Sequence, residues 1–219
     1  IENGDSSLLD ADARARIRGV AAATAISAEF IDSLPNLEVI ANFGVGYDAV
    51  DAAHVASRGV MVTNTPDVLS DEVAGLGRSG LAIARRLEAF GLGIHYHTRN
   101  KRADVDYPWH ARLIDLAGAV DTLVVVVPGG AATEKAVNAE VLNALGPQGV
   151  LISVGRGSTI DEPALIAALQ EKRIAAAGLD VFAHEPHVPQ ELMDLPNACL
   201  LPHVASASVS TRNAMADLV

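Results

Sequence analysis

The sequence VLISVGRG, residues 150–157, decides the fold, because an apolar run of strand length ends in two glycines that flank Arg156. Short apolar runs bounded by glycine are typical of buried strands, and the two glycines allow the backbone to turn sharply. A helical pattern follows, with Asp161 as the expected N-cap and Pro163 in the first turn. The strand and helix together predict a parallel α/β unit with Arg156 at the end of its strand.

Two more apolar runs are followed by polar residues. Residues 175–182 precede Glu185, and residues 198–201 precede His203. In an open parallel sheet the carboxyl ends of the strands share one edge, where ligands bind. We therefore expect Arg156, Glu185 and His203 to meet at that edge.

These three groups suit the reduction of a small 2-keto acid. A guanidinium can hold a carboxylate through two hydrogen bonds, so Arg156 would bind the substrate carboxylate and polarise the carbonyl. His203 would donate the proton, which requires a pKa near the working pH. Glu185 would orient the imidazole and raise its pKa. The alternative is that all three are ordinary loop residues.

The order of the motifs resembles the D-isomer-specific 2-hydroxyacid dehydrogenases. The shared motifs are VGRGS at 154–158, GLDVF at 178–182 with Glu185-Pro186, and PHVAS at 202–206. Glu185 follows Arg156 by 29 positions, and His203 follows Glu185 by 18. The resemblance runs from about residue 17 to the last residue, and within the family it is greatest to the glyoxylate, hydroxypyruvate and hydroxyphenylpyruvate reductases.

The resemblance implies an α/β protein of two Rossmann-like domains, each a doubly wound parallel sheet, with a cleft between them and with parts missing. Residues 1–74 plus 204–219 would form a partial substrate (catalytic) domain. Residues 75–203 would form the dinucleotide-binding domain without its first strand. Relatives dimerise, so a homodimer is expected. Both ends of the chain look cut, since it begins at Ile1 and stops inside a helical pattern.

The resemblance also implies site residues. Arg156, Glu185 and His203 would be catalytic, and the main-chain N–H groups of Val45 and Gly46 would bind the substrate together with Arg156. From the residues alone, the loop 44–48 could be an anion-binding nest or merely a tight turn. The expected cofactor contacts are Leu76, Gly77, Arg78, Ser79, Thr98, Arg99, Asn100, Val127, Pro128, Val154, Gly155, Asp180 and His203.

Residues 75–80 read GLGRSG, a glycine loop of the kind that holds a pyrophosphate at a helix N-terminus. This fingerprint requires a buried strand directly before it, and residues 70–74, SDEVA, are too polar. Family members carry several tens of residues here, including the first strand of the nucleotide domain. We therefore expect that Ala74 and Gly75 are not neighbours in the parent protein. If they were joined, the sheet would lack its central strand and should not bind a dinucleotide.

The loop after the expected strand 93–98 bears on the cofactor. A carboxylate there binds the ribose 2′-hydroxyl of NAD, whereas the 2′-phosphate of NADP requires positive charge. Residues 98–102 contain no acid and three cations, Arg99, Lys101 and Arg102. This favours NADP(H) over NAD(H). The alternative is an ordinary solvated basic loop, which would have the same composition.

The composition limits the class of partner. With 27 acidic and 16 basic side chains the net charge is −11, which argues against nucleic acid or an anionic membrane surface. The only cysteine, Cys199, lies in an apolar run and is expected to be buried, and a chain without a disulfide fits a cytoplasmic setting. No apolar run approaches the about 20 residues of a membrane span, and no signal peptide opens the chain. No His, Asp or Glu spacing predicts a metal site.

The remaining elements follow from hydrophobic periodicity. Further strands are expected at 19–23, 37–43, 59–64 and 122–127, the last buried on both faces, and further helices at 28–34, 51–57, 81–91, 113–119, 133–145 and 206–219. Residues 107–110 are expected to form a loop.

The leading interpretation is an oxidoreductase that converts glyoxylate, hydroxypyruvate or an aryl pyruvate to the D-2-hydroxy acid with NAD(P)H, His203 being the proton donor. The alternative is a dinucleotide-sensing protein of the corepressor type on the same fold. Every catalytic group is present, which is compatible with both. Turnover that is lost in His203→Ala would separate them.

Overall fold

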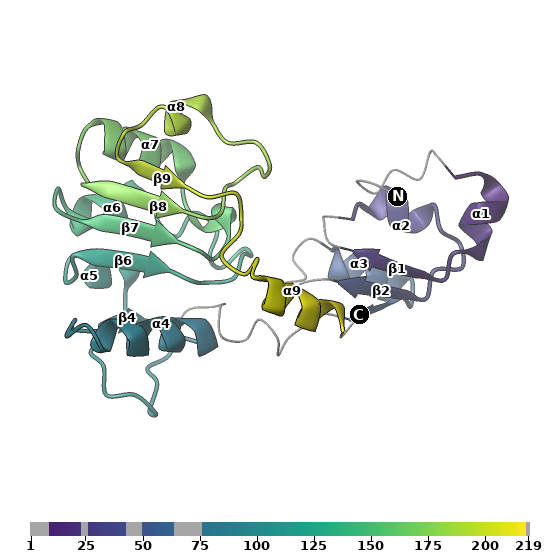
Figure 1. Cartoon of the computed structure of the whole chain (residues 1–219), viewed down its shortest axis with the longest axis horizontal. Helices are drawn as coiled ribbons and strands as arrows, with labels where there is room; N and C mark the ends of the chain where they lie inside the picture. The colour runs from purple at the N-terminus through teal and green to yellow at the C-terminus, as the bar shows by residue number, and fades with distance from the viewer. Residues whose placement is uncertain (1–8, 23–25, 43–49, 64–75, 218–219) are drawn as a thin grey trace. The chain divides into compact units, whose positions relative to one another are not determined.

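The computed structural model describes residues 9–22, 26–42, 50–63 and 76–217 (Figure 1). It divides into two compact units, one formed by Ile1–Ser70 with Ser208–Val219 and the other by Asp71–Ala207. Val45, Gly46 and the junction between Ala74 and Gly75 lie outside the described residues.

The first unit contains a three-stranded parallel sheet in the order β1-β2-β3. Its elements are α1 (Ala11–Arg16), β1 (Gly19–Ala22), α2 (Ala28–Asp32), β2 (Val39–Asn42), α3 (Ala52–Ser57), β3 (Met61–Thr63) and α9 (Val209–Ala216). Side chains of Asp10, Ser27 and Asp51 accept hydrogen bonds from first-turn N–H groups and so begin the first three helices. The core includes Ile31, Leu34, Ile40 and Val55, all fully buried. The sequence did not predict α1.

The second unit contains two parallel sheets (Figure 1). A two-stranded sheet pairs β4 (Tyr96–His97) with β5 (Trp109–His110), and a four-stranded sheet has the order β6 (Thr122–Val125), β7 (Val150–Ser153), β8 (Ala176–Leu179), β9 (Ala198–Leu200). The helices are α4 (Arg78–Glu88), α5 (Leu113–Ala117), α6 (Ala139–Leu145), α7 (Glu162–Gln170) and α8 (Gln190–Met193). The expected parallel α/β fold is confirmed, and the carboxyl ends of the four strands share one edge.

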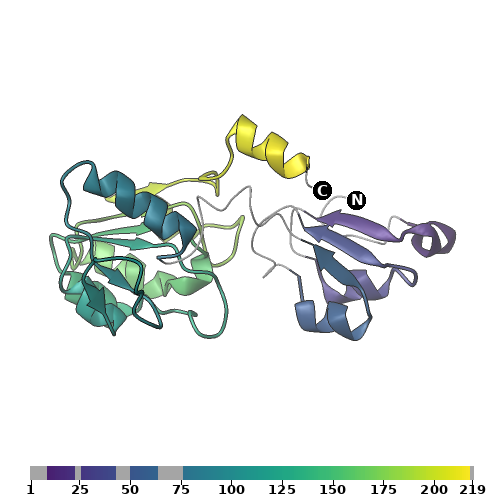
Figure 2. The same cartoon turned by 90° about the horizontal axis from the view of Figure 1, so that it is seen from below.

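The main core of the second unit lies on one face of the four-stranded sheet. Leu123, Leu151 and Ala177 are in register on β6, β7 and β8 and are at most 3% exposed. They belong to one cluster with buried residues of α5, α6 and α7. Figure 2 shows α6 and α7 (green) on one side of the strands and α4 (dark blue) on the other. Hydrophobic burial on this face therefore fixes the register of the strands.

The opposite face of the same sheet is less covered. The row formed by Val124, Ile152, Gly178 and Cys199 is half-buried on its first three strands, and Cys199 is exposed. The expectation that Cys199 is buried is therefore wrong, as is the expectation that β6 is buried on both faces. The apolar character of both runs predicts a strand but does not show which face has a covering helix.

Two further expectations need correction. The helix expected at 133–145 begins only at Ala139, because the Asn138 side chain accepts hydrogen bonds from the N–H groups of Glu140 and Val141. The residues expected to form a loop at 107–110 contain β5, which pairs with β4. The Tyr96 N–H donates to the Pro108 carbonyl at 2.9 Å, a contact that sequence periodicity cannot show.

Candidate active site

A histidine and a glutamate from separate loops form the centre of the site. His203 Nδ1 lies 2.7 Å from Glu185 Oε2, and the two side chains are 46% and 34% exposed. The other carboxylate oxygen, Oε1, accepts a hydrogen bond of 2.9 Å from the Phe182 N–H. Both oxygens of Glu185 are therefore engaged, which fixes the carboxylate against the imidazole.

The loop that carries His203 is fastened to the end of β8. The carboxylate of Asp180, which is 3% exposed, accepts hydrogen bonds from the N–H groups of Val204 at 2.8 Å and Ala205 at 2.9 Å. These bonds hold the residues that directly follow His203, whose backbone has a φ of 53°. Asp180 was expected to contact the cofactor, and in the structure it anchors this loop.

Glu162 is a further anchor that the sequence did not single out. It is 7% exposed, and its Oε1 accepts a hydrogen bond of 2.7 Å from the Ala183 N–H. This bond fixes the loop that carries Glu185. An acidic residue directly after the N-cap Asp161 is ordinary for a helix, so its position in the sequence gave no signal of this contact.

Arg156 follows β7 at the same edge, between two glycines that cannot be replaced without movement of the backbone. A Cβ on Gly155 would lie 2.6 Å from the Val127 carbonyl oxygen, and a Cβ on Gly157 would lie 1.9 Å from the Phe182 carbonyl carbon. Because Gly157 packs directly on Phe182, Arg156 is held beside the loop that carries Glu185. One guanidinium nitrogen, Nη1, donates to the Gly155 carbonyl at 2.9 Å.

The pKa values of the pair move in opposite directions. The hydrogen bond to Glu185 raises the pKa of His203 above its usual value, against the opposing effects of burial and of the positive charge of Arg156. Burial of the Glu185 carboxyl opposes its ionisation, but the hydrogen bonds from His203 and the Phe182 N–H, with the charge of Arg156, outweigh it and lower its pKa. The pair is therefore set up as a protonated imidazole beside a carboxylate.

The glycine loop leads into α4 and fits an anionic group. The N-cap of α4 is Gly77, and no side chain accepts from the first-turn N–H groups, in contrast to the capped helices α2, α3, α6 and α7. Ser79 is buried, and its hydroxyl has no hydrogen-bond partner among the described residues. Exposed N–H groups at a helix N-terminus form an anion site, so these residues fit a dinucleotide pyrophosphate.

The loop after β4 lies next to this glycine loop. Arg102 donates to the Leu76 carbonyl and forms an ion pair with Asp104. Arg102 is therefore committed to contacts within the protein, and the exposed cations of the loop are Arg99 and Lys101. The Thr98 hydroxyl donates to the Asn100 carbonyl at 2.6 Å and closes the turn.

Three other expected cofactor residues lie at the same edge of the four-stranded sheet. Val127 and Pro128 follow β6, and Val154 follows β7 and donates its N–H to the Val125 carbonyl at 3.1 Å.

The described part of the chain contains no cluster of three potential metal ligands. It also contains no helix that is long and apolar enough to cross a membrane.

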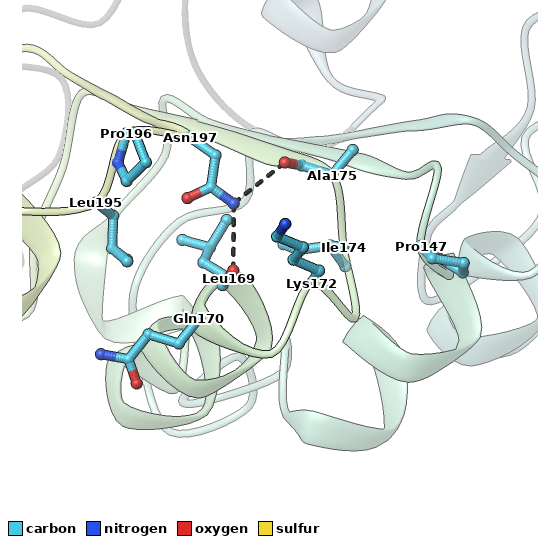
Figure 3. Close-up of a pocket in the computed structure, with 9 residues that line it drawn as sticks. All are labelled: Pro147, Leu169, Gln170, Lys172, Ile174, Ala175, Leu195, Pro196 and Asn197. Carbon is cyan, nitrogen blue, oxygen red and sulfur yellow. Dashed lines mark hydrogen bonds between the residues drawn. The ribbon is translucent and has the colours of Figure 1, made fainter.

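A pocket of about 330 Å³ lies away from this chemistry, where β8 and β9 begin (Figure 3). The Asn197 amide donates to the carbonyls of Leu169 and Ala175 there, both at 3.2 Å, and so ties α7 to the start of the sheet. The lining residues are Pro147, Leu169, Gln170, Lys172, Ile174, Ala175, Leu195, Pro196 and Asn197. Because they lie at the edge opposite His203 and include a single titratable side chain, Lys172, we assign this pocket a structural role.

Comparison with known proteins identifies the family of the chain. Residues 37–205 match the model of the D-isomer specific 2-hydroxyacid dehydrogenase, NAD binding domain. The chain is 43% identical over 237 residues to hydroxyphenylpyruvate reductase of Plectranthus scutellarioides, a match that covers 88% of this chain and 76% of the relative. It is 42% identical over 243 residues to glyoxylate/hydroxypyruvate reductase A HPR2 of Arabidopsis thaliana, covering 90% and 78%. Both matches run over more positions than the 219 residues of this chain, so both relatives carry residues without a counterpart here.

A solved structure is similar along the whole chain. The NADPH-dependent glyoxylate/hydroxypyruvate reductase of Sinorhizobium meliloti, in complex with NADP and malonate, aligns with a TM-score of 0.93 and 49% sequence identity. The alignment covers 100% of this chain and 83% of that one.

Proposed function

The chain belongs to the D-isomer specific 2-hydroxyacid dehydrogenase family, and we propose that it reduces a small 2-keto acid to the D-2-hydroxy acid. The candidate substrates are glyoxylate, hydroxypyruvate and an aryl pyruvate, because the relatives are named for reduction of such compounds. The observation that carries the proposal is the hydrogen bond of 2.7 Å between His203 and Glu185, beside the charge of Arg156.

His203 is the proposed proton donor. Its Nδ1 carries the proton shared with Glu185, so Nε2 holds the proton that is given to the substrate oxygen. The hydrogen bond to Glu185 raises the pKa of the imidazole and so favours its protonated form, which suits the direction of reduction. A bound nicotinamide dinucleotide would supply the hydride.

Arg156 is the proposed substrate anchor. Its guanidinium would bind the substrate carboxylate and stabilise the charge that develops on the carbonyl oxygen. The main-chain N–H groups of Val45 and Gly46 are proposed as further carboxylate donors. These assignments leave His203 to face the carbonyl, because its Nδ1 is already held by Glu185.

NADP(H) is the proposed cofactor. The uncapped N-terminus of α4, with Leu76, Gly77, Arg78 and Ser79, would hold the pyrophosphate. Thr98, Arg99 and Asn100 would face the adenosine ribose, where the exposed Arg99 and Lys101 favour a 2′-phosphate. Further contacts are proposed from Val127, Pro128, Val154, Gly155 and His203. The described S. meliloti relative is NADPH-dependent, which supports this preference.

The roles of the two units follow from this scheme. We assign dinucleotide binding to residues 75–203 and substrate binding to residues 1–74 with 204–219. A homodimer and a cytoplasmic location stay predictions. The net charge of −11 continues to disfavour a nucleic-acid partner.

The test is oxidation of NADPH, followed by absorbance, with glyoxylate and then hydroxypyruvate as substrate. His203→Ala should lower kcat by at least about a hundredfold, the usual contribution of a general acid, a larger effect than any on the Kd for NADPH, for which His203 is one of several proposed contacts. His187→Ala is the matched control, since His187 is an exposed histidine near Glu185. Tight NADPH binding with no turnover of any 2-keto acid would instead support the dinucleotide-sensing alternative.

A further inference from the structure

We infer that Tyr96 and Arg102 are positioning residues that set the cofactor preference by holding the loop 98–102 in one shape beside the glycine loop. Arg99 and Lys101 of this loop then present their charges to the 2′-phosphate of an adenosine. The inference rests on the proposed NADP(H) site and deepens it, because it assigns the preference in part to side chains that do not themselves touch the phosphate.

The Tyr96 side chain ties the end of this loop to a buried core. Tyr96 is 3% exposed and belongs to one small cluster with Leu76 and Ala84. Its hydroxyl accepts a hydrogen bond of 2.9 Å from the Arg102 N–H and donates one of 3.4 Å to the Arg102 carbonyl. Because the ring is packed in the cluster, its hydroxyl holds both main-chain groups of Arg102 at a fixed place.

The start of the loop is held by a second aromatic side chain. The Trp109 indole N–H donates to the Thr98 carbonyl at 3.2 Å, and the Thr98 hydroxyl donates to the Asn100 carbonyl at 2.6 Å. Trp109 packs against the same small cluster as Tyr96. The two aromatic residues lie opposite each other on the paired strands β4 and β5. Both ends of the loop are therefore bonded to one rigid support.

The Arg102 side chain joins this loop to the glycine loop. Its Nη1 donates to the Leu76 carbonyl, while Nε, at 2.9 Å, and Nη2 donate to the two carboxylate oxygens of Asp104. A planar guanidinium can make these three bonds at once, whereas a lysine ammonium presents a single nitrogen. Asp104 also balances the charge of Arg102, so the net positive charge of the loop comes from the exposed Arg99 and Lys101.

The order of the loop matters because of what binding would otherwise require. Neither Arg99 nor Lys101 forms a side-chain hydrogen bond or ion pair with another described residue, so both can take a ligand. A flexible loop would have to become ordered around the phosphate, which weakens binding. A loop that is already ordered avoids this loss. Only a ligand with a 2′-phosphate benefits, because that group is the one the two cations bind in the proposed site.

The experiment compares two ligands that differ only in the 2′-phosphate, adenosine 2′,5′-bisphosphate and adenosine 5′-monophosphate. Calorimetric titration gives the Kd of each. We expect the wild-type protein to bind the bisphosphate at least about tenfold more tightly, the effect of a charged hydrogen bond. Tyr96→Phe should reduce this ratio by about three- to tenfold, because it removes the hydroxyl and keeps the ring. Tyr107→Phe is the matched control, since that hydroxyl donates to Glu88 at 2.6 Å and not to the loop.

Two variants outside the buried core separate position from charge. Arg102→Lys keeps the positive charge and loses the planar fork, so a positioning role predicts a ratio as low as in Tyr96→Phe. Asp104→Asn removes a negative charge and one acceptor of the fork. A positioning role predicts a smaller ratio for it, and an effect of charge alone predicts a larger one. The side chains of Arg102 and Asp104 are 29% and 62% exposed, so neither substitution opens a cavity in the core.

An unchanged ratio in Tyr96→Phe, or equal weakening of both ligands, would overturn the inference. A wild-type ratio in Arg102→Lys or a larger ratio in Asp104→Asn would overturn it too. Because neither ligand contains nicotinamide, the outcome does not depend on the proposed reduction. The expected ratios without turnover of any 2-keto acid would support the inference and count against the reductase activity. Reduction by NADH with a wild-type ratio near one would overturn the inference and leave the reductase activity standing.

Discussion

The Nδ1 atom of His203 lies 2.7 Å from Oε2 of Glu185, and this contact joins a loop after β9 to a loop after β8. It raises the pKa of the imidazole and lowers that of the carboxyl. The contact exists because Asp180 and Glu162 hold the main chain of both loops. The chemistry of the site therefore depends on two buried carboxylates that need not touch the substrate.

Glu185→Gln should move the pH dependence of reduction. Reduction requires protonated His203, so kcat/KM falls as the pH rises through the pKa of that imidazole. A neutral amide cannot favour the imidazolium as a carboxylate does, and the inflection should move to lower pH. The measurement is the pH profile of kcat/KM with hydroxypyruvate for both proteins. An unchanged inflection with a uniformly lower rate would mean that Glu185 only positions the ring.

The same pair should affect stability only within a pH window. The pKa of His203 is raised above 6.5, so its contribution is lost as the pH rises through the folded-state value. The pKa of Glu185 is lowered below 4.5, so its contribution is lost as the pH falls through the folded-state value. Because both side chains are at least a third exposed, the difference in unfolding free energy between wild type and Glu185→Gln should be below about 1 kcal/mol even inside the window.

Urea unfolding of both proteins at several pH values measures this difference. It should be largest near pH 5 to 6, about midway between the two usual values, and should shrink on both sides. A difference that stays constant across the whole range would show that the charges of the pair do not contribute.

Gly157→Ala should damage the site through the backbone. The added Cβ would lie 1.9 Å from the Phe182 carbonyl carbon, and the Phe182 N–H holds Glu185. We expect a loss of about 1 to 3 kcal/mol in unfolding free energy from overpacking, with a fall in kcat. Gly93→Ala is the matched control, because a Cβ at Gly93 meets nothing within 4 Å. Equal effects of the two substitutions would contradict the argument.

Asp180→Asn tests whether this residue anchors the loop or binds cofactor. The carboxylate accepts two N–H groups, and an amide offers only one acceptor oxygen, so one part-buried N–H loses its partner at a cost of about 0.5 to 1.5 kcal/mol. The anchoring role predicts lower stability, a lower pKa of His203 and an unchanged Kd for NADPH. Asp194→Asn, an exposed carboxylate, is the control. A weaker Kd at unchanged stability would favour direct cofactor contact.

The sequence predicts the positions of the chemical groups better than the contacts that hold them. Arg156, Glu185 and His203 follow apolar runs, and parallel strands bring such positions to one edge regardless of the details of packing. The anchoring by Asp180 and Glu162 depends on which backbone N–H groups lie opposite, and this is known only once the loops are folded. Whether Cys199 is exposed likewise depends on which other parts of the chain pack over its face of the sheet. A local sequence pattern does not show this.

Arg99→Asp should reverse the preference for the cofactor. Arg99 and Lys101 are the exposed cations of the loop after β4, while Arg102 is held by Asp104 and the Leu76 carbonyl. Removal of a charged hydrogen-bond donor to a phosphate costs about 1.5 to 3 kcal/mol, which corresponds to a rise of about tenfold or more in the KM for NADPH. The KM for NADH should change by less than about threefold or improve, because an acid at this position can bind the ribose 2′-hydroxyl.

The measurement compares the Michaelis constants for NADPH and for NADH between the wild-type protein and the Arg99→Asp variant. Arg16→Asp, an equal change of charge on the exposed surface of the first unit, controls for the net charge of the protein. Parallel changes in both constants would show that Arg99 does not face the 2′-position. A large effect of Arg102→Ala with none from Arg99→Asp would instead place the discrimination in the contact between Arg102 and the glycine loop.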